Sequence, residues 1–434
     1  MSSPFSWKAA GAVAASALAI VACGGSNAPA PGSKGTIVIG VDLPESGNEA
    51  SNGIPTLNGV KFAVQQQGDL KGFKIEVLNF DDAVNGVHDP QKGAQNVNQM
   101  LSNPNLLAMI GPFNSNVARA EIPITNAAGL VMISPANTAE CLTIDLPYCD
   151  PTPAKLRPTG KPNNYYRVAA TDTRQGPAMA DYAYDVLNLK SLAVGSDNET
   201  YGKGIANNFQ KEFEKKGGKT VLRQDFDTKS TSDFRPFISS AKSKGAQGVY
   251  FGGTDSNKSC VVRSQMKGIF DAATPFMGGD GIVTAQCLKD AADNSVGSYG
   301  TLAAVDAGQV AEAQPTIKAF KAAFPAAGDY GGYTIPAYSA TKAIFEAIST
   351  AIDAAKGSKP TREQVRDAMQ KVKNLKTPIG TISFDSVGDV VPQIITVYSV
   401  KQASQTEAAD SPACGTGAAS STCFVFAKTV NYTG

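Results

Sequence analysis

The alternation of short apolar runs with amphipathic stretches after residue 35 constrains this chain most. Four of these runs have the character of strands buried on both faces: 36–41, 73–80, 107–111 and 130–134. Between them, apolar residues recur at helical spacing, as at Val97, Met100 and Leu101. This order predicts a parallel sheet flanked by helices, an α/β architecture.

The same order begins again after residues 141–164, a proline-rich stretch without periodicity. Seven further runs are predicted to be strands: 166–169, 191–195, 247–252, 275–278, 298–305, 379–384 and 394–400. Between the runs at 298–305 and 379–384 lie three predicted helices, the last opening with a capping box at Thr361. Their apolar faces need a sheet to cover, and the first sheet is the one not yet supplied with enough helices.

A return of these helices to the first sheet predicts two lobes joined by three hinge crossings, near residues 165, 303 and 378. The expected first lobe comprises residues 36–165 and 303–378. The second lobe then comprises residues 166–302 and 379–434. With 434 residues the chain is long enough for two cores.

The N-terminus has the pattern of a lipoprotein signal peptide over residues 1–22. A single cation, Lys8, precedes an apolar stretch that is too short to span a bilayer. The run Ile20-Val21-Ala22-Cys23 resembles a lipobox, in which the thiol of Cys23 receives the lipid. Residues 23–35 then form a flexible tether. We therefore expect an extracytoplasmic protein that is lipid-anchored to the bacterial cell membrane; a plain signal peptide with a chance cysteine is the alternative.

Six cysteines remain after Cys23, and outside the cytosol an even set is most simply interpreted as disulfides. They occur as neighbours along the chain: Cys141 and Cys149, Cys260 and Cys287, Cys414 and Cys423. A metal site is the weaker interpretation, because the chain has no Cys-x-x-Cys and only one histidine, His88. We expect His88 to be a solvated loop residue.

Charge and motifs exclude several classes of function. The 39 basic and 38 acidic residues nearly cancel, so no electrostatic footprint for nucleic acid exists. A Ser-x-x-Lys motif at Ser239 and Lys242 lies in mid-helix without its companion motifs, and no nucleophile–base pair is evident. We expect a monomeric protein that is not an enzyme and that needs no cofactor or metal.

Polar residues follow several predicted strands, where open parallel sheets bind their ligands. Ser115 follows the run at 107–111, and Ala136, Asn137 and Thr138 follow the run at 130–134. In the other unit the corresponding positions hold Tyr201, Thr254 and Asp280. Hydroxyls beside helix N–H groups on one lobe and an acid on the other suit a zwitterion. The plainer alternatives are helix caps at Ser115 and Thr138, a packing aromatic at Tyr201 and a turn residue at Asp280.

Five separated motifs resemble those of the branched-chain amino-acid-binding proteins, which are type I periplasmic binding proteins of ABC importers. They run in order over residues 36–400: Gly111-Pro112-x-x-Ser115, Ile133-Ser134-Pro135-Ala136-Asn137-Thr138, Thr200-Tyr201-Gly202-Lys203-Gly204, Tyr250-Phe251-Gly252-Gly253 and Phe276-Met277-Gly278-Gly279-Asp280-Gly281. The resemblance implies that Ser115, Thr138 and the backbone at Ala136 hold the ligand carboxylate. It implies that Asp280 holds the ammonium group and that Tyr201 closes over the ligand.

Two departures from the family pattern concern the ligand side chain. Family members often have aromatic residues near Asn52 and Thr254, which are polar here, and the acid is Asp280 rather than a glutamate. The resemblance implies a receptor that captures an amino acid, branched-chain or more polar, and delivers it to a membrane ABC permease. A ligand sensor of the same fold, or a site for an amide, urea or an aromatic carboxylate, is the alternative.

Overall fold

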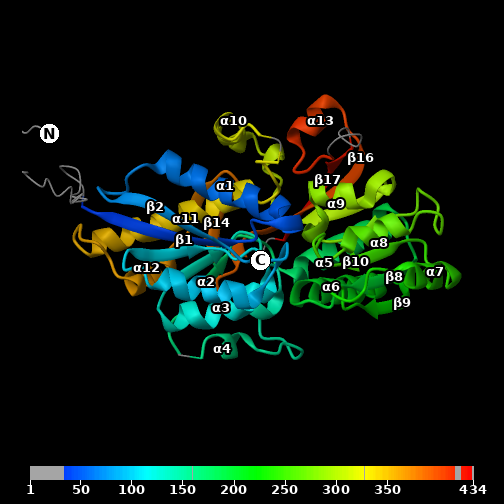
Figure 1. Cartoon of the computed structure of the whole chain (residues 1–434), viewed down its shortest axis with the longest axis horizontal. Coiled ribbons are helices and arrows are strands. Elements are labelled where there is room, and N and C mark those ends of the chain that lie inside the picture. Colours follow the sequence, from blue (N-terminus) through cyan, green and yellow to red (C-terminus); the bar gives the residue numbers. More distant parts are fainter. Residues whose placement is uncertain (1–33, 159, 327, 416–421, 433–434) are drawn as a thin grey trace, which may run out of the picture.

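The computed structural model describes residues 34–158, 160–326, 328–415 and 422–432, which form two α/β lobes side by side (Figure 1). The signal peptide, Cys23 and nearly all of the tether lie outside the described residues. None of the helices in the described ranges is both long and apolar enough to span a bilayer.

The first lobe is built on a five-stranded parallel sheet. Its order is β2 (Lys74–Asp81), β1 (Thr36–Leu43), β5 (Leu106–Ile110), β6 (Val131–Ser134) and β7 (Tyr165–Arg167). The helices of this half of the chain are α1 (Ala50–Gln67), α2 (Pro90–Leu101), α3 (Ser115–Ala127) and the short α4 (Pro153–Leu156). A two-stranded ribbon, β3 (Ala83–Val84) and β4 (Val87–His88), stands beside them.

Both faces of this sheet are covered, as the apolar runs predict. On β1, Ile37, Ile39 and Val41 belong to one core, whereas Val38 belongs to the core beneath α2 and α3. The other face is covered by α1 and by two helices from late in the chain, α11 (Thr334–Ala354) and α12 (Arg362–Met369), while α10 (Gln314–Ala323) packs against α1 (Figure 1). The capping box expected at Thr361 is present at the start of α12.

The second lobe is built on a seven-stranded mixed sheet. Its order is β17 (Thr422–Tyr432), β16 (Gln393–Gln402), β12 (Ser298–Leu302), β11 (Phe276–Met277), β10 (Val249–Gly252), β8 (Ser191–Ser196) and β9 (Lys219–Asp225). β16 and β17 are antiparallel to their neighbours, and the other pairs are parallel. Its helices are α5 (Asp172–Asp181), α6 (Thr200–Lys215), α7 (Arg235–Ser243), α8 (Ser259–Gln265) and α9 (Ala285–Ala291), and α13 (Gln405–Asp410) lies beside β17.

The strand predicted at 166–169 to open the second unit belongs instead to the first sheet. It is β7, and it pairs with β6. The proline-rich stretch before it is therefore an insertion within the first lobe rather than a boundary. A small sheet of β13 (Leu375–Thr377), β14 (Gly380–Phe384) and β15 (Val390–Val391) is separate from both main sheets, and Asp389 bridges to Arg167 of β7.

Three segments that connect the lobes lie side by side. The Ala170 N–H donates to the Ala303 carbonyl over 2.8 Å, and the Thr171 N–H donates to Gln393 Oε1 over 2.9 Å. The Thr396 hydroxyl donates to the Ala304 carbonyl over 2.9 Å. These contacts gather residues around 170, 304 and 394 into one junction between the sheets.

The three cysteine pairs form disulfides: Cys141–Cys149, Cys260–Cys287 and Cys414–Cys423, with Cα–Cα distances of 5.3, 5.2 and 4.0 Å.

A buried ion pair, Arg167 with Asp389, holds the small sheet against the first lobe. Its Nε–Oδ1 distance is 2.6 Å, and the two side chains are 0% and 2% exposed. We expect Asp389→Asn to lower the free energy of unfolding by about 3–5 kcal/mol, because it leaves a buried guanidinium without its counter-charge.

The matched control is Asp293→Asn, which breaks the exposed pair with Lys267 and should cost at most about 1 kcal/mol. Urea denaturation of both variants measures the difference. Equal losses in the two variants would contradict this account of the ion pair.

Candidate functional site

The loops after β5 and β6 are tied together by one hydroxyl. Ser134 Oγ donates to the Pro112 carbonyl over 2.7 Å and accepts from the Asn137 N–H over 2.9 Å. The Ala139 N–H, in turn, donates to Ser115 Oγ over 3.3 Å. Because parallel strands end at one edge of the sheet, these bonds bring both loops to the N-terminus of α3.

The side chain of Asn137 takes part in the hydrogen bonds that hold these loops together. Its side-chain Nδ2 donates to the Phe113 carbonyl over 2.7 Å, and its Oδ1 accepts from the Tyr165 hydroxyl over 3.0 Å. The side chain is fully buried. Asn137 therefore braces the loop from behind and does not line the pocket described below.

Asp280 is the centre of the opposing wall. It follows β11 in the second lobe and accepts hydrogen bonds from Tyr201 Oη at 2.7 Å and from Gln175 Nε2 at 2.9 Å. A third donor is Tyr333, whose hydroxyl reaches Asp280 Oδ2 over 2.5 Å from the segment before α11 on the first lobe. Burial raises the pKa of Asp280, while the hydroxyls of Tyr333 and Tyr201 oppose that shift.

Tyr201 is fixed in the pocket wall. Its hydroxyl is held by Asp280, and burial raises the pKa of this phenol well above its usual range. The ring therefore stands as part of the pocket wall in this conformation.

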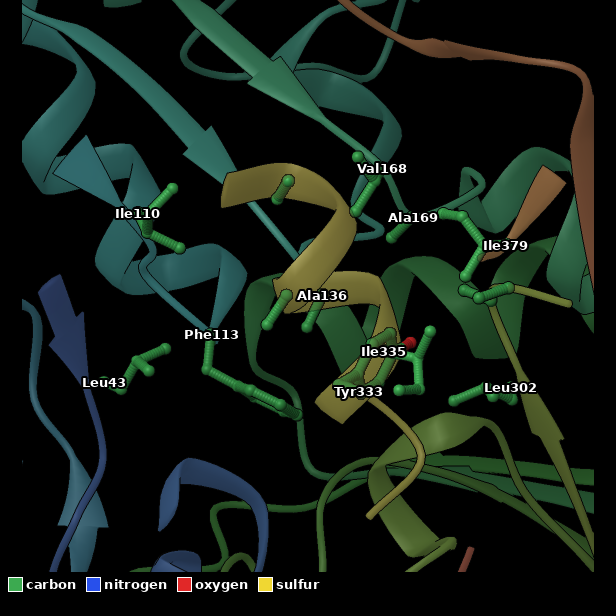
Figure 2. Close-up of a cluster of buried hydrophobic side chains, with 14 of the residues drawn as sticks. Leu43, Ile110, Phe113, Ala136, Val168, Ala169, Leu302, Tyr333, Ile335 and Ile379 are labelled. Atoms are coloured by element: carbon green, nitrogen blue, oxygen red, sulfur yellow. The ribbon is translucent and has the colours of Figure 1, made fainter. Parts of the chain in front are cut away.

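Six of the seven residues expected to bind ligand line a single pocket between the lobes: Ser115, Ala136, Thr138, Tyr201, Thr254 and Asp280. The first three come from the first lobe and the last three from the second. Phe113 also lines this pocket and packs edge-on against Tyr333, with ring centroids 5.3 Å apart. Figure 2 shows Phe113 pointing toward Tyr333, with Ala136 nearby.

His88 is not the solvated loop residue that we expected. Its side chain is only 3% exposed, and Nδ1 lies 2.8 Å from Glu49 Oε2. It lines the pocket, at the end of the short ribbon strand β4. The expectation was wrong because local sequence showed a turn, whereas Glu49, 39 positions away, supplies the partner that allows burial.

The Glu49–His88 pair is charged and links the lobes. Glu49 is fully buried and accepts from Asn114 Nδ2 at 2.7 Å and from the hydroxyl of Ser256 on the second lobe. Burial opposes both charges, but the Glu49 carboxylate nevertheless raises the pKa of His88. His88 and the hydrogen-bond donors around Glu49 lower the pKa of that carboxyl.

Sequence reasoning missed Glu49, Gln175 and Tyr333 entirely. Glu49 belongs to a loop after the first strand, and Gln175 lies within α5, so neither stands in a motif. Tyr333 follows Gly331-Gly332 just before α11. A bulky aromatic after a glycine pair is the one signal that could have singled it out.

The two lobes are in contact around the rim of the pocket. Asn116 Nδ2 donates to Glu199 Oε2 over 2.9 Å, and Arg119 Nη1 donates to Thr200 Oγ1 over 2.9 Å. This structure is therefore in a closed conformation. Across the described ranges, no cluster of three or more histidine, cysteine or acidic residues is arranged to hold a metal ion.

Comparison with known proteins agrees with the fold and with the motifs. Residues 36–406 match the family described as periplasmic binding protein. The chain belongs to this family. A leucine-, isoleucine-, valine-, threonine- and alanine-binding protein of Pseudomonas aeruginosa is 29% identical over 378 residues, which cover 86% of this chain and 92% of the relative. A Leu/Ile/Val-binding protein homologue of Brucella melitensis is 29% identical over 82% of this chain and 88% of its own length.

Solved structures of periplasmic binding proteins share this fold. The leucine-binding protein LivK of Thermotoga maritima superposes with a TM-score of 0.71 at 23% identity, covering 84% of this chain and 96% of that one. A solute-binding protein of Rhodopseudomonas palustris, solved with p-hydroxybenzoic acid, reaches 0.73 at 17% identity over 91% and 97%. These likenesses support the two-lobed type I architecture.

Three buried carboxyls give the stability of this protein a distinct pH dependence. Burial raises the pKa of Asp42 and of Asp197 to about 7, and that of Asp255 to about 8. In the unfolded chain an aspartate titrates near about 3.9. Between these values the folded protein binds more protons than the unfolded one, so the free energy of unfolding falls as pH rises.

We therefore expect the melting temperature to be higher near pH ~5 than near pH ~8 at constant ionic strength. Asp42→Asn should flatten this slope because it removes one of these titrations. Differential scanning calorimetry across this range measures both effects. A melting temperature that rises from the lower to the higher pH would contradict the assignment.

Proposed function

We propose that this protein is the extracytoplasmic substrate-binding component of an ABC importer, and that it captures an amino acid between its lobes. One observation carries the proposal: hydroxyls at a helix N-terminus on one lobe face a buried aspartate on the other across a single pocket. The amino-acid-binding relatives, which match most of their own length, support it.

The first-lobe wall suits a carboxylate. Ser115 begins α3, a helix of 13 residues whose first N–H groups have no intrahelical partner and carry partial positive charge. Thr138 and the backbone at Ala136 lie on the neighbouring loop. A carboxylate in this place accepts from hydroxyl and backbone donors at once.

The second-lobe wall suits an ammonium group. Asp280 accepts three hydrogen bonds from Tyr201, Gln175 and Tyr333. An ionised carboxylate offers about four acceptor positions, so one remains for a ligand N–H. The ligand ammonium then supplies the positive counter-charge for the buried Asp280 carboxylate, whose protein partners are all neutral donors.

The position of the junction between the two sheets suggests how the lobes close around a ligand. We propose that the three connecting segments near residues 170, 304 and 394 act as the hinge, the last crossing falling after β15 rather than near 378. A ligand that contacts both walls favours the closed form by contacts that the open form cannot make. The closed form is then the one presented to the permease.

Asp280→Asn tests the ammonium assignment. It should weaken amino-acid binding by about ten- to a hundredfold, because a hydrogen bond to a charged group contributes about 1.5–3 kcal/mol and each 1.4 kcal/mol corresponds to tenfold in affinity. Thermal-shift and calorimetric titrations with the common amino acids measure it, since a ligand at 100 times its Kd adds roughly 2.7 kcal/mol of stability.

Asp293→Asn, the same chemical change on the surface, is the control and should leave affinity unchanged. Unaltered affinity in Asp280→Asn would remove the proposed role of this carboxylate. Stabilisation by p-hydroxybenzoate or urea, with none by any amino acid, would overturn the proposed function.

We also propose that Cys23 carries a lipid that tethers the folded part through residues 23–35. Cys23→Ala should release the protein from the membrane fraction into the soluble extracytoplasmic fraction, because the acyl chains are the anchor. Fractionation followed by immunoblotting measures this change. A variant that stays with the membrane, as the native protein does, would contradict the lipid anchor.

A further inference from the structure

Beyond the residues proposed to hold the carboxylate and the ammonium group, most side chains that line the pocket are polar, and the ring of Phe113 is apolar. Apart from Ala136, none of the described residues that line it has an aliphatic side chain. Imidazole, amide, carboxylate and hydroxyl groups make up this region: His88, Asn116, Asp197, Glu199, Thr254 and Asn257. A branched aliphatic side chain would displace the water around these groups without replacing their hydrogen bonds, which disfavours it.

His88 presents one fixed donor to this region. Its Nδ1 is occupied by Glu49, so Nε2 is the polar ring atom that remains, and no other described residue bonds to it. Glu49 is itself held by Asn114 and Ser256, which prevents the pair from rotating. The Glu49 carboxylate, 2.8 Å from Nδ1, raises the pKa of His88 and so favours the imidazolium form, in which Nε2 carries a proton.

Glu199 presents an acceptor to the same region. It stands at the N-cap of α6, and its Oε2 accepts from Asn116 over 2.9 Å. Its other carboxylate oxygen has no partner among the described residues. His88 and Glu199 line the same pocket, and the charge of Glu199 contributes to the raised pKa of His88.

A fixed donor beside a free acceptor matches a carboxamide, which accepts through its oxygen and donates through its nitrogen. Resting on the proposed function, we propose that this pocket selects amino acids whose side chain ends in a carboxamide. His88 Nε2–H donates to the amide oxygen, and Glu199 accepts from the amide nitrogen. A side-chain carboxylate would meet the charge of Glu199, and a side-chain ammonium would meet the protonated ring of His88.

Calorimetric titration of the full-length protein with L-glutamine, L-asparagine, L-alanine and L-leucine tests this selectivity. We expect glutamine or asparagine to bind at least tenfold more tightly than alanine and leucine. Alanine has the same carboxylate and ammonium groups but lacks the side-chain amide, so its affinity measures the contribution of the carboxylate and ammonium sites alone.

Two variants separate recognition from structural support. Glu199→Ala should weaken binding of the carboxamide amino acid about tenfold and leave alanine binding unchanged; Glu214→Ala, at the exposed far end of the same helix, is the matched control. His88→Phe keeps a ring and removes both nitrogens. Because it strands the Glu49 carboxylate, the double variant Glu49→Gln/His88→Phe accompanies it, with the same expectation.

The outcomes distinguish this inference from the proposed function. Tighter binding of leucine than of either carboxamide amino acid would overturn the inference and leave the proposed function standing. An equal loss for glutamine and alanine in the variants would show a structural role and remove His88 and Glu199 as selectivity residues. Binding of free acetamide without any amino acid, or of no amino acid at all, would overturn both.

Discussion

The closed arrangement of this protein depends on one buried carboxylate that both lobes share. Asp280 belongs to the second lobe, where Tyr201 and Gln175 donate to it, and Tyr333 reaches it from the first lobe. A buried charge is costly unless it is neutralised, and hydroxyl and amide dipoles reduce that cost without removing it. The proposed ligand ammonium completes the neutralisation. In the proposed function, ligand binding and closure of the lobes therefore occur together. The Asp280 carboxylate that would bind the ligand ammonium also accepts the hydrogen bond of Tyr333 from the other lobe.

A second charged centre, the Glu49–His88 pair, differs in an important respect. It is neutral as a whole and already satisfied, since Asn114 and Ser256 complete the hydrogen bonds of Glu49. It therefore needs no ligand in order to persist in the closed form. In the proposed selectivity, a protonated His88 ring can only donate a hydrogen bond, so it favours a ligand group that accepts one.

The sequence predicted the fold well wherever the signal was local. Buried parallel strands such as β1 contain a continuous apolar run, here residues 37–41, and the capping box at Thr361 predicts the start of α12. The order of motifs likewise predicted which loops meet at the pocket. Edge strands were harder: β9 shows neither a continuous apolar run nor a clean alternation, and only the first half of β17 is apolar and buried. β7 was assigned to the wrong lobe, because an insertion of proline-rich sequence looks like a linker when pairing partners are unknown.

The site residues that escaped prediction are those whose importance arises only from long-range pairing. His88 is buried because Glu49 meets it, and Tyr333 matters because α11 returns to the first lobe and brings it to Asp280. The residues adjacent to His88 and Tyr333 in the sequence do not indicate either of these long-range contacts. Asn137 shows the converse. It lies within a recognisable motif, yet its side chain forms hydrogen bonds with the Phe113 carbonyl and the Tyr165 hydroxyl behind the loop. A motif therefore identifies the loop, and only the packing identifies which of its side chains faces the ligand.

Two of the disulfides hold loops next to the pocket and the cleft. Cys260 lies in α8, just after the loop that holds Thr254, and Cys287 lies in α9, just after the loop that holds Asp280. The bond between them therefore fixes two binding loops of the second lobe relative to each other. Cys141–Cys149 closes a loop next to Glu140, which accepts from Asn208 across the cleft. Rigid walls reduce the entropy lost on binding, and in the proposed function the three connecting segments supply the motion.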